Sequence, residues 1–423
     1  MLKITCEGVY YKNGGFVPAK DGPAAGLPAP EKAREGTMAH AILKAHNTGD
    51  NMEELAIRFD AMASHDITYV GIIQTARASG MQAFPLPYVL TNCHNSLCAV
   101  GGTINEDDHV FGLSAAKKYG GEFVPAHQSV IHSYMRERYA APGRMILGSD
   151  SHTRYGAYGT MAIGEGGPEL ARQLLSKTYN IPYPKVIAIY LTGTPIPGVG
   201  PQDVALELIR STFKDGVVKN AVMEFFGPGV ANLSMDYRSG IDVMTTETTC
   251  LSSIWPADHT LKAHLAVLGR GEAFKPQAPA DGAYYDGLIE VELDKIRPMI
   301  ALPFHPSNAY TIQEFQENLD ELLHQVDEDT VRQLKLKNRP ASLREKIVDG
   351  KFRVDQGVIA GCSGGTYQNI VRAAQILDGR AIGSGEFWLS VYPTSQPVNL
   401  ELTRRGYIAS LMAAGASIRS CFC

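Results

Sequence analysis

Short apolar runs alternate with segments of helical periodicity along most of this 423-residue chain. Residues 144–148 and 185–193 are apolar and have the length of strands, and residues 167–179 between them have the apolar spacing of an amphipathic helix. Helices that connect parallel strands produce this alternation in α/β proteins. The sequence therefore predicts an α/β fold.

The alternation continues on both sides of this unit. Residues 52–64 place apolar side chains on one helical face, and residues 67–74 resemble a buried strand, so we expect a helix followed by a strand. Further helices are expected at residues 202–213 and 312–326. In the last part of the chain a strand, a turn and a helix follow one another twice, with strands at 358–360 and 387–392 and helices at 366–377 and 399–414.

Length and proline clusters indicate several domains. One hydrophobic core rarely organises more than about 250–300 residues. Proline and glycine punctuate the chain around residues 193–201, and prolines recur at 303–306. We expect domain boundaries near 196 and 305, which gives predicted domains at 1–196, 197–305 and 306–423.

Composition favours a cytoplasmic protein without a membrane span. Hydrophobic residues make up 44% of the chain and charged residues 20%, and 39 Lys and Arg against 44 Asp and Glu give a net charge of −5. Neither sign occurs in blocks, so binding to nucleic acid is not expected. No apolar stretch approaches the ~18 residues of a membrane span, and the first residues do not resemble a secretion signal.

Seven cysteines in a chain of this kind favour reduced thiols or a metal site over a disulfide framework. Cys362 lies between an apolar run and a predicted helix, in a glycine-rich turn where the helix dipole favours a thiolate. Cys421 and Cys423 share one face of an extended segment, so either could be a ligand. The alternative for Cys362 is a half-buried cysteine in an ordinary turn. For Cys421 and Cys423 it is a frayed terminus without a role.

Histidines and an aspartate in glycine-punctuated segments are further candidates. In residues 148–153, His152 is flanked by hydroxyl groups and follows Asp150 at the end of a predicted strand, a pattern that suits acid–base catalysis and the binding of carboxylates. His94 and His132 lie in comparable segments. Each histidine alone is more often structural, but three together favour a site.

Taken together, these segments resemble the aconitase family of hydro-lyases. Four segments match family motifs: 148–153 resembles Gly-Thr-Asp-Ser-His-Thr, 163–167 resembles Ile-Gly-Val-Gly-Gly, 224–230 resembles Glu-Tyr-x-Gly-Pro-Gly-Val, and 361–367 resembles Gly-Cys-Thr-Asn-Ser-Ser-Tyr. Their order and spacing agree over nearly the whole chain. The resemblance implies three α/β/α domains around a shared cleft, without the family's fourth, swivelling domain.

The resemblance also implies an iron–sulfur cofactor. In this family three cysteines hold a [4Fe–4S] cluster, and the fourth iron stays open as a Lewis acid for the substrate. Cys362 matches the first cysteine and Cys423 the second, and the third would lie three residues after Cys423, where this chain has ended. We therefore expect a truncated chain without a cluster and without hydratase activity of its own, with its terminal residues mobile or differently placed.

The family's serine base and several substrate-binding arginines lie beyond the cluster cysteines. The missing part would be a C-terminal domain of the same chain or a separate small subunit, as in isopropylmalate isomerases. Truncation is the interpretation that we favour, because those large subunits also continue past their third cysteine.

The family's other site positions carry over one by one: a substrate-binding glutamine at Gln74, a proton-donating histidine at His94, a histidine–aspartate pair at His132 and Asp150, substrate-facing groups at Ser151 and His152, and a glutamate beside the iron-bound water at Glu247. We expect His132 and Asp150 to lie within hydrogen-bonding distance, about 2.6–3.2 Å.

Three departures from the family pattern leave the substrate open. Cys93 replaces an aspartate that would orient His94, Val243 replaces an asparagine near the cluster, and residues 363–366 are Ser-Gly-Gly-Thr instead of Thr-Asn-Ser-Ser. Loss of the carboxylate at position 93 is expected to weaken the acid role of His94. Citrate is therefore not assumed as the substrate.

Three classes of function compete. The one we favour is a hydro-lyase or isomerase that acts on a small hydroxy-polycarboxylate by dehydration and rehydration. The second is a catalytically silent relative with a binding role, for instance to RNA, which the net charge of −5 supports little. The third is a thiol–metal protein with Cys93, His94 and Cys98 as ligands. The sequence nearby offers no second set of ligands at a matching spacing, which counts against this class.

Overall fold

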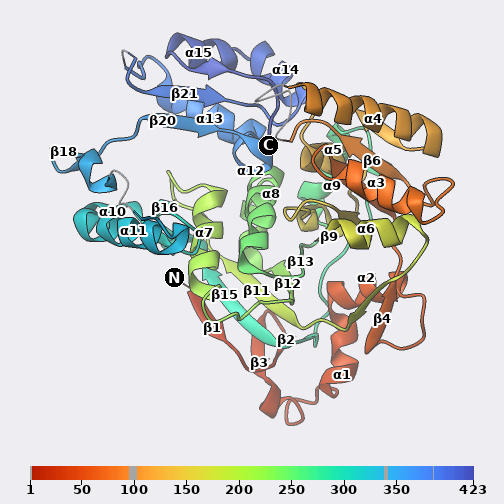
Figure 1. Cartoon of the computed structure of the whole chain (residues 1–423). Coiled ribbons are helices and arrows are strands. Elements are labelled where there is room, and N and C mark those ends of the chain that lie inside the picture. The colour runs from red at the N-terminus through yellow and green to blue at the C-terminus, as the bar shows by residue number, and fades with distance from the viewer. Residues whose placement is uncertain (1, 95–101, 338–341, 384) are drawn as a thin grey trace.

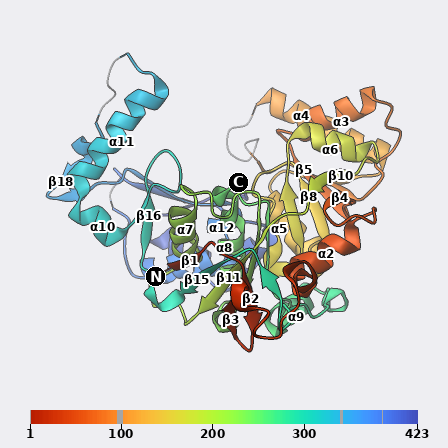
Figure 2. The same ribbon diagram turned by 90° about the horizontal axis from the view of Figure 1, so that it is seen from below.

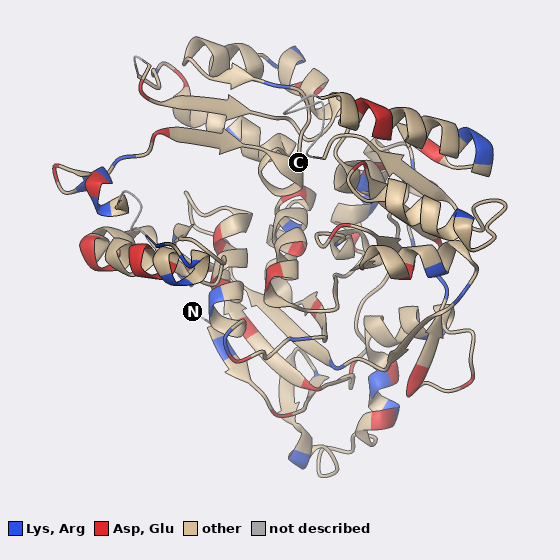
Figure 3. Ribbon diagram, in the orientation of Figure 1, with Lys and Arg blue, Asp and Glu red and all other residues tan. Residues whose placement is uncertain are grey.

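The computed structural model describes residues 2–94, 102–337, 342–383 and 385–423. The described helices and strands form the expected α/β architecture, in which helices pack around two five-stranded sheets and a three-stranded sheet (Figure 1). Within these ranges no helix is both long and apolar enough to cross a membrane. Lysine and arginine are scattered among aspartate and glutamate along the ribbon (Figure 3).

The first sheet is entirely parallel and has the strand order β7-β6-β5-β8-β9. Its strands are β5 (Ala61–His65), β6 (Tyr88–Thr91), β7 (Glu122–Val124), β8 (Met145–Gly148) and β9 (Met161–Gly164). One face is covered by α3 (Tyr69–Ala78), α4 (Thr103–Tyr119) and α6 (Gly167–Leu174), and the other by α5 (Ile131–Arg138) (Figure 2). Because both faces are covered, every residue of β5 and β8 is buried.

The second sheet has the order β1-β15-β11-β12-β13, with β1 antiparallel at the edge and the other strands parallel. Its strands are β1 (Leu2–Thr5), β11 (Val186–Thr192), β12 (Val222–Phe226), β13 (Ser252–Ile254) and β15 (Gly287–Glu292). The helices α7 (Pro201–Thr212) and α8 (Met235–Met244) follow β11 and β12. Ser252 Oγ of β13 donates to the carbonyl of Ala162 in β9 at 2.7 Å, so the two sheets contact each other directly.

A buried carboxylate ties the N-terminal region to the second sheet. Glu224 of β12 is fully buried and accepts hydrogen bonds from the N–H groups of Met38 and Ala39, at 3.1 and 2.9 Å, at the start of α2 (Met38–His46). Tyr285 Oη donates a third bond at 2.7 Å. Burial outweighs these bonds and raises the pKa of Glu224 to about 7, so its protonated form is well populated near neutral pH.

The third sheet is parallel and consists of β20 (Gln356–Ile359), β21 (Trp388–Val391) and β22 (Ser417–Ile418). The helices of this part are α12 (Gly361–Gly364), α13 (Tyr367–Leu377), α14 (Gln396–Arg404) and α15 (Tyr407–Ala413). After β22, the N–H of Arg419 donates to the carbonyl of Val391 at 2.8 Å, and the chain ends beside α12 (Figure 1). The terminal residues thus continue alongside the third sheet, and their mobility stays a prediction.

Two predicted elements near the N-terminus are wrong. Residues 52–64 contain β4 (Glu54–Ile57) and most of β5 instead of a helix, and residues 67–74 begin helix α3 instead of forming a strand. The strand β5 is buried on both faces, so the alternation that distinguishes a strand from a helix is lost. Ile72 and Ile73 of α3 are buried with Tyr69 and Ala76, and these tertiary contacts outweigh the strand propensity of the two isoleucines.

Most other predicted elements are present, but two predicted helices are each divided. Residues 312–326 form α10 (Ile312–Glu317) and the start of α11 (Leu319–Leu334). Residues 399–414 include parts of α14 and α15, and Gly406 between them has a φ of 83°, which ends the first helix. The domain ranges stay a prediction, although residue 196 lies between β11 and β12, which pair in one sheet.

Candidate active site

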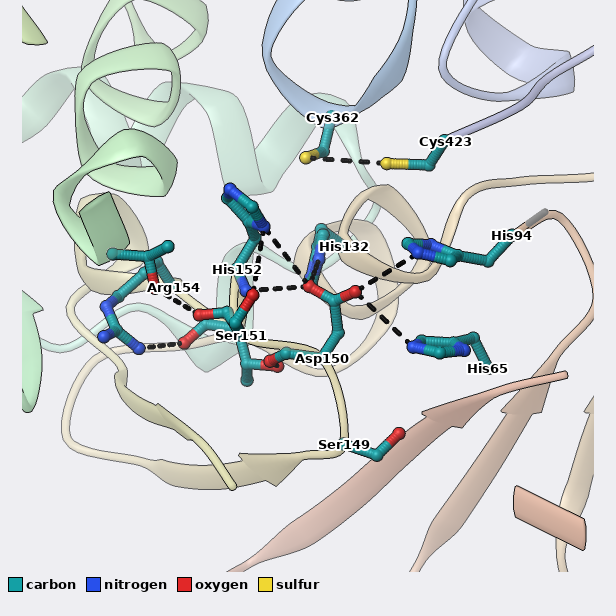
Figure 4. Close-up of polar contacts among 12 residues, drawn as sticks. His65, His94, His132, Ser149, Asp150, Ser151, His152, Arg154, Cys362 and Cys423 are labelled. Carbon is teal, nitrogen blue, oxygen red and sulfur yellow. Dashed lines mark hydrogen bonds and ion pairs between the residues drawn. The ribbon is translucent and has the colours of Figure 1, made fainter. Parts of the chain in front are cut away.

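Strands of the first sheet bring candidate residues to one edge. His65 is the last residue of β5, His94 follows β6 and Asp150 follows β8. Because the carboxyl ends of parallel strands meet at the same edge of a sheet, these side chains lie together. Figure 4 shows the assembled set: His65, His94, His132, Asp150, Ser151, His152, Cys362 and Cys423.

Asp150 is the centre of the histidine network. Its Oδ1 accepts hydrogen bonds from His132 Nε2 at 2.9 Å and from the His152 N–H at 2.7 Å. Its Oδ2 lies 3.5 Å from Nε2 of both His65 and His94. The expected hydrogen bond between His132 and Asp150 is thus confirmed.

The buried pair of His132 and Asp150 places a negative charge on the aspartate. Burial lowers the pKa of His132 despite the facing carboxylate, so the ring is neutral and donates from Nε2, while Nδ1 lies 3.2 Å from Tyr155 Oη. Burial alone would raise the pKa of Asp150, but His132, His152 and His94 hold it well below its ordinary value. Asp150 therefore stays ionised across the whole physiological range.

His152 carries the opposite charge. Its Nε2 lies 3.0 Å from Glu247 Oε1, and its Nδ1 lies 3.6 Å from Asp150 Oδ1. Burial alone would lower the pKa of His152, but the bonds with Asp150 and Glu247 raise it to about 9. Glu247, on the 3₁₀ turn Thr245–Thr248, has a lowered pKa because His152 donates to it. At neutral pH the site therefore contains an imidazolium between two carboxylates.

His65 and His94 stack on each other, with ring centroids 4.1 Å apart and an angle of 11° between the planes. Burial and the neighbouring His94 lower the pKa of His65 to about 3, whereas Cys423 and Asp150 raise that of His94 against the effect of burial. With Asp150 they offer nitrogen and oxygen atoms within 4.8 Å of one another. A single metal ion cannot lie in both of two parallel ring planes, so this trio is not arranged as a mononuclear metal site.

The thiols of Cys362 and Cys423 face each other next to these histidines. Their Sγ atoms are 3.9 Å apart, and the N–H of Cys423 donates to the carbonyl of Cys93 at 3.1 Å. The contact between the two thiols raises the pKa of Cys362, and the same contact, with His94 nearby, lowers the pKa of Cys423. Cys421 turns away and donates from Sγ to the His127 carbonyl at 2.9 Å.

Two buried residues, Arg136 and Cys93, pack next to the thiol pair. Arg136 of α5 donates from Nη1 to the carbonyl of Cys362 at 3.1 Å. Cys93 accepts the N–H of His127 at its Sγ, 3.1 Å away, and packs in an apolar cluster with Val243. The replacements at 93 and 243 therefore give this side of the site an apolar lining. Cys98, the third member of the alternative thiol–metal set, lies outside the described residues.

Two of the expected residues are exposed. Gln74 is exposed on α3, and its substrate-binding role stays a prediction. Ser151 is exposed beside His152, with Oγ 3.4 Å from Nδ1 of that ring. His65 was missed, although it stands at the end of an apolar run in Ser64-His65-Asp66. His65 was omitted because a helix was predicted at 52–64, so the end of strand β5 was not recognised.

An ionised aspartate held among histidines, beside a pair of thiols, can carry out acid–base chemistry. Comparison with known proteins identifies the class more closely. The family model described as the aconitase family (aconitate hydratase) matches residues 40–423. The chain belongs to the aconitase family, a family of hydro-lyases whose members generally carry a [4Fe–4S] cluster.

Curated relatives agree with this membership. The chain is 30% identical over 390 residues to a mitochondrial aconitate hydratase of Schizosaccharomyces pombe, covering 87% of this chain and 46% of the relative. It is 29% identical to that of Gracilaria gracilis, covering 75% of this chain and 39% of the relative. It is 26% identical to that of Saccharomyces cerevisiae, covering 92% and 50%. The chain thus spans about half the length of these relatives.

The expected cytoplasmic location is contradicted by these relatives. All three are named as mitochondrial proteins. Composition and the lack of a secretion signal do not distinguish the cytoplasm from an organelle, so the sequence could not support the expectation.

Proposed function

We propose that this chain carries a large part of the active site of a hydro-lyase or isomerase, which dehydrates and rehydrates a small hydroxy-polycarboxylate. The observation that carries the proposal is the position of His152, which faces both Asp150 and Glu247 and has a pKa of about 9. Its side chain is 38% exposed, so the imidazolium can also bind a carboxylate of an anionic substrate.

The thiol pair fits the iron–sulfur group of the family. The two sulfur atoms face each other, and a Cβ on Gly361 would lie 3.4 Å from Cys423 Sγ, so the glycine leaves room beside this sulfur. Cys362 and Cys423 would hold the group as thiolate ligands. When bound, a [4Fe–4S] cluster with an open iron supplies a Lewis acid for substrate oxygen atoms.

His94 is the candidate proton donor. Its Nε2 lies 3.5 Å from Asp150 Oδ2, and the charge of Asp150 favours a proton on His94. In the family, an aspartate at the position of Cys93 orients this histidine. In this chain Asp150 can supply that negative charge instead. His132 holds the same carboxylate from the other side, so Asp150 stays ionised and fixed while His94 gives up its proton.

The complete reaction requires more than these residues in our proposal. The relatives are about twice as long, since the chain covers 46% and 50% of two of them. We propose that the 423-residue chain alone holds no complete cluster and has no hydratase activity. The remaining groups would come from a C-terminal domain or a small subunit.

The test is a dehydration assay on this chain combined with the proposed C-terminal domain or small subunit, reconstituted with iron and sulfide without oxygen. A hydroxy-tricarboxylate should give an unsaturated acid that is followed by ultraviolet absorbance. His152→Gln should lower kcat/KM by about 10²-fold or more, as for loss of an acid–base group. His259→Gln, which changes an exposed histidine at the start of α9 (His259–Val267), is the control. Full iron content without turnover of any hydroxy-polycarboxylate would contradict the proposal and favour a silent relative.

A further inference from the structure

Glu247 has a second imidazole neighbour besides His152. Nε2 of His305 lies 3.6 Å from Glu247 Oε2, the oxygen that does not contact His152. His305 lies in the connection between β16 (Met299–Ala301) and β17 (Ala309–Thr311), far along the chain from both partners. Each oxygen of the Glu247 carboxylate therefore faces a different imidazole.

The ring of His305 is held in a fixed orientation. It stacks on Phe213, directly after α7, with centroids 4.0 Å apart and 27° between the planes. Its Nδ1 accepts the N–H of Ser307 at 3.1 Å and lies 3.0 Å from Ser307 Oγ. Because Nδ1 accepts a backbone N–H, the neutral ring has its proton on Nε2 and directs it at Glu247.

The connection that carries His305 is itself tied to α7. The N–H of Met299 in β16 donates to Asp203 Oδ1 at 2.6 Å, and β16 pairs with β17 on the other side of the connection. Phe213, on which the ring stacks, follows the end of the same helix. The orientation of His305 is therefore set by the second sheet's helix layer, independently of the strand ends that carry Asp150 and His152.

We propose that His305 is a positioning residue of this site, which holds the Glu247 carboxylate between itself and His152 and thereby fixes the imidazolium of His152. Its importance for catalysis rests on the proposed function, but its contact with Glu247 does not. The distance of 3.6 Å is longer than a hydrogen bond, so the interaction is electrostatic. The side chains are 36% and 25% exposed, so the effect is moderate and weakened by salt.

The proposal predicts a change in the proton affinity of Glu247. The titratable groups that face this carboxylate are His152 and His305, and the interaction with each of them lowers the pKa of Glu247. In His305→Gln the proton-binding constant of Glu247 should rise about 1.5- to 5-fold at low ionic strength, as for loss of a partly exposed electrostatic contact. It is measured on the 423-residue chain without metal, from the ¹³C shift of the Glu247 carboxyl group against pH, assigned with Glu247→Gln.

Two further variants make the test decisive. His324→Gln changes an exposed histidine on the neighbouring α11 and should leave the Glu247 titration unchanged. If His305→Gln does not unfold cooperatively, Ser307→Ala replaces it, because loss of the Oγ contact should give a smaller rise of the same sign. An unchanged Glu247 titration, or an equal change in the control, would overturn the proposal. The readout needs neither cluster nor activity, so a failed dehydration assay would leave this result standing.

Discussion

The Nε2 atom of His132 donates a hydrogen bond of 2.9 Å to Oδ1 of Asp150, and both side chains are buried. This bond fixes the one carboxylate that also faces His65, His94 and His152. The orientation of the whole histidine network therefore depends on a residue of α5 that has no access to solvent.

Removal of His132 should destabilise the protein as well as the site. In His132→Ala, Asp150 loses its main partner while it remains buried, and breaking a buried pair in this way costs about 3 kcal/mol. Urea unfolding followed by circular dichroism gives the change in the free energy of unfolding. An unchanged free energy would mean that the pair contributes nothing to the fold.

The raised pKa of His152 makes stability depend on pH. The pKa rises from 6.5 to about 9 on folding, so the stabilisation is fully present below pH 6.5 and is lost as the pH rises through 9. Because the side chain is more than one third exposed, solvent screening reduces the effect to about 1–2 kcal/mol. The free energy of unfolding should fall by this amount between the two pH values, and His152→Gln should remove the fall. A variant with the same fall would contradict the assignment.

Glu224 produces a second dependence on pH, at lower values. Its pKa rises from 4.5 to about 7 on folding, so its contribution to stability is present below pH 4.5 and is lost as the pH rises through 7. For a fully buried group this change corresponds to about 3 kcal/mol. Unfolding at intervals from pH 4.5 to 7 should give a falling free energy in the native protein and a flatter curve in Glu224→Gln. Equal slopes would show that Glu224 is ionised in the folded protein.

Gly164 leaves room for the turn that carries Asp150. A Cβ at this position would lie 2.4 Å from the carbonyl oxygen of Asp150 and 3.0 Å from Cα of Ser151. Gly164→Ala should therefore push the turn away, destabilise the protein by about 1–3 kcal/mol and lower the pKa of His152. Gly166→Ala is the matched control, because its Cβ would contact only Pro168 at 3.7 Å. Histidine titration by NMR compares the two, and equal titration of His152 in both would contradict the packing argument.

The sequence predicted the fold class and most of the residues that the structure brings together at the candidate site, because strand ends and glycine turns mark where parallel strands deliver polar residues. It failed at β5, where burial on both faces removed the strand pattern, so His65 was missed. The contact of His305 with Glu247 could not be predicted either. It depends on how the connection after β16 folds back against α7, which no local pattern encodes.

The iron and sulfide content is best measured on this chain combined with its proposed C-terminal domain or small subunit and reconstituted without oxygen. We expect the four iron and four sulfide ions of one cluster in this native protein and in Cys6→Ala, which changes an exposed cysteine far along the chain from the site. We expect their loss in Cys362→Ala and in Cys423→Ala. Full cluster content in either of these two variants, or none in the native protein, would contradict the assignment of this site as the cluster-bearing centre of a hydro-lyase.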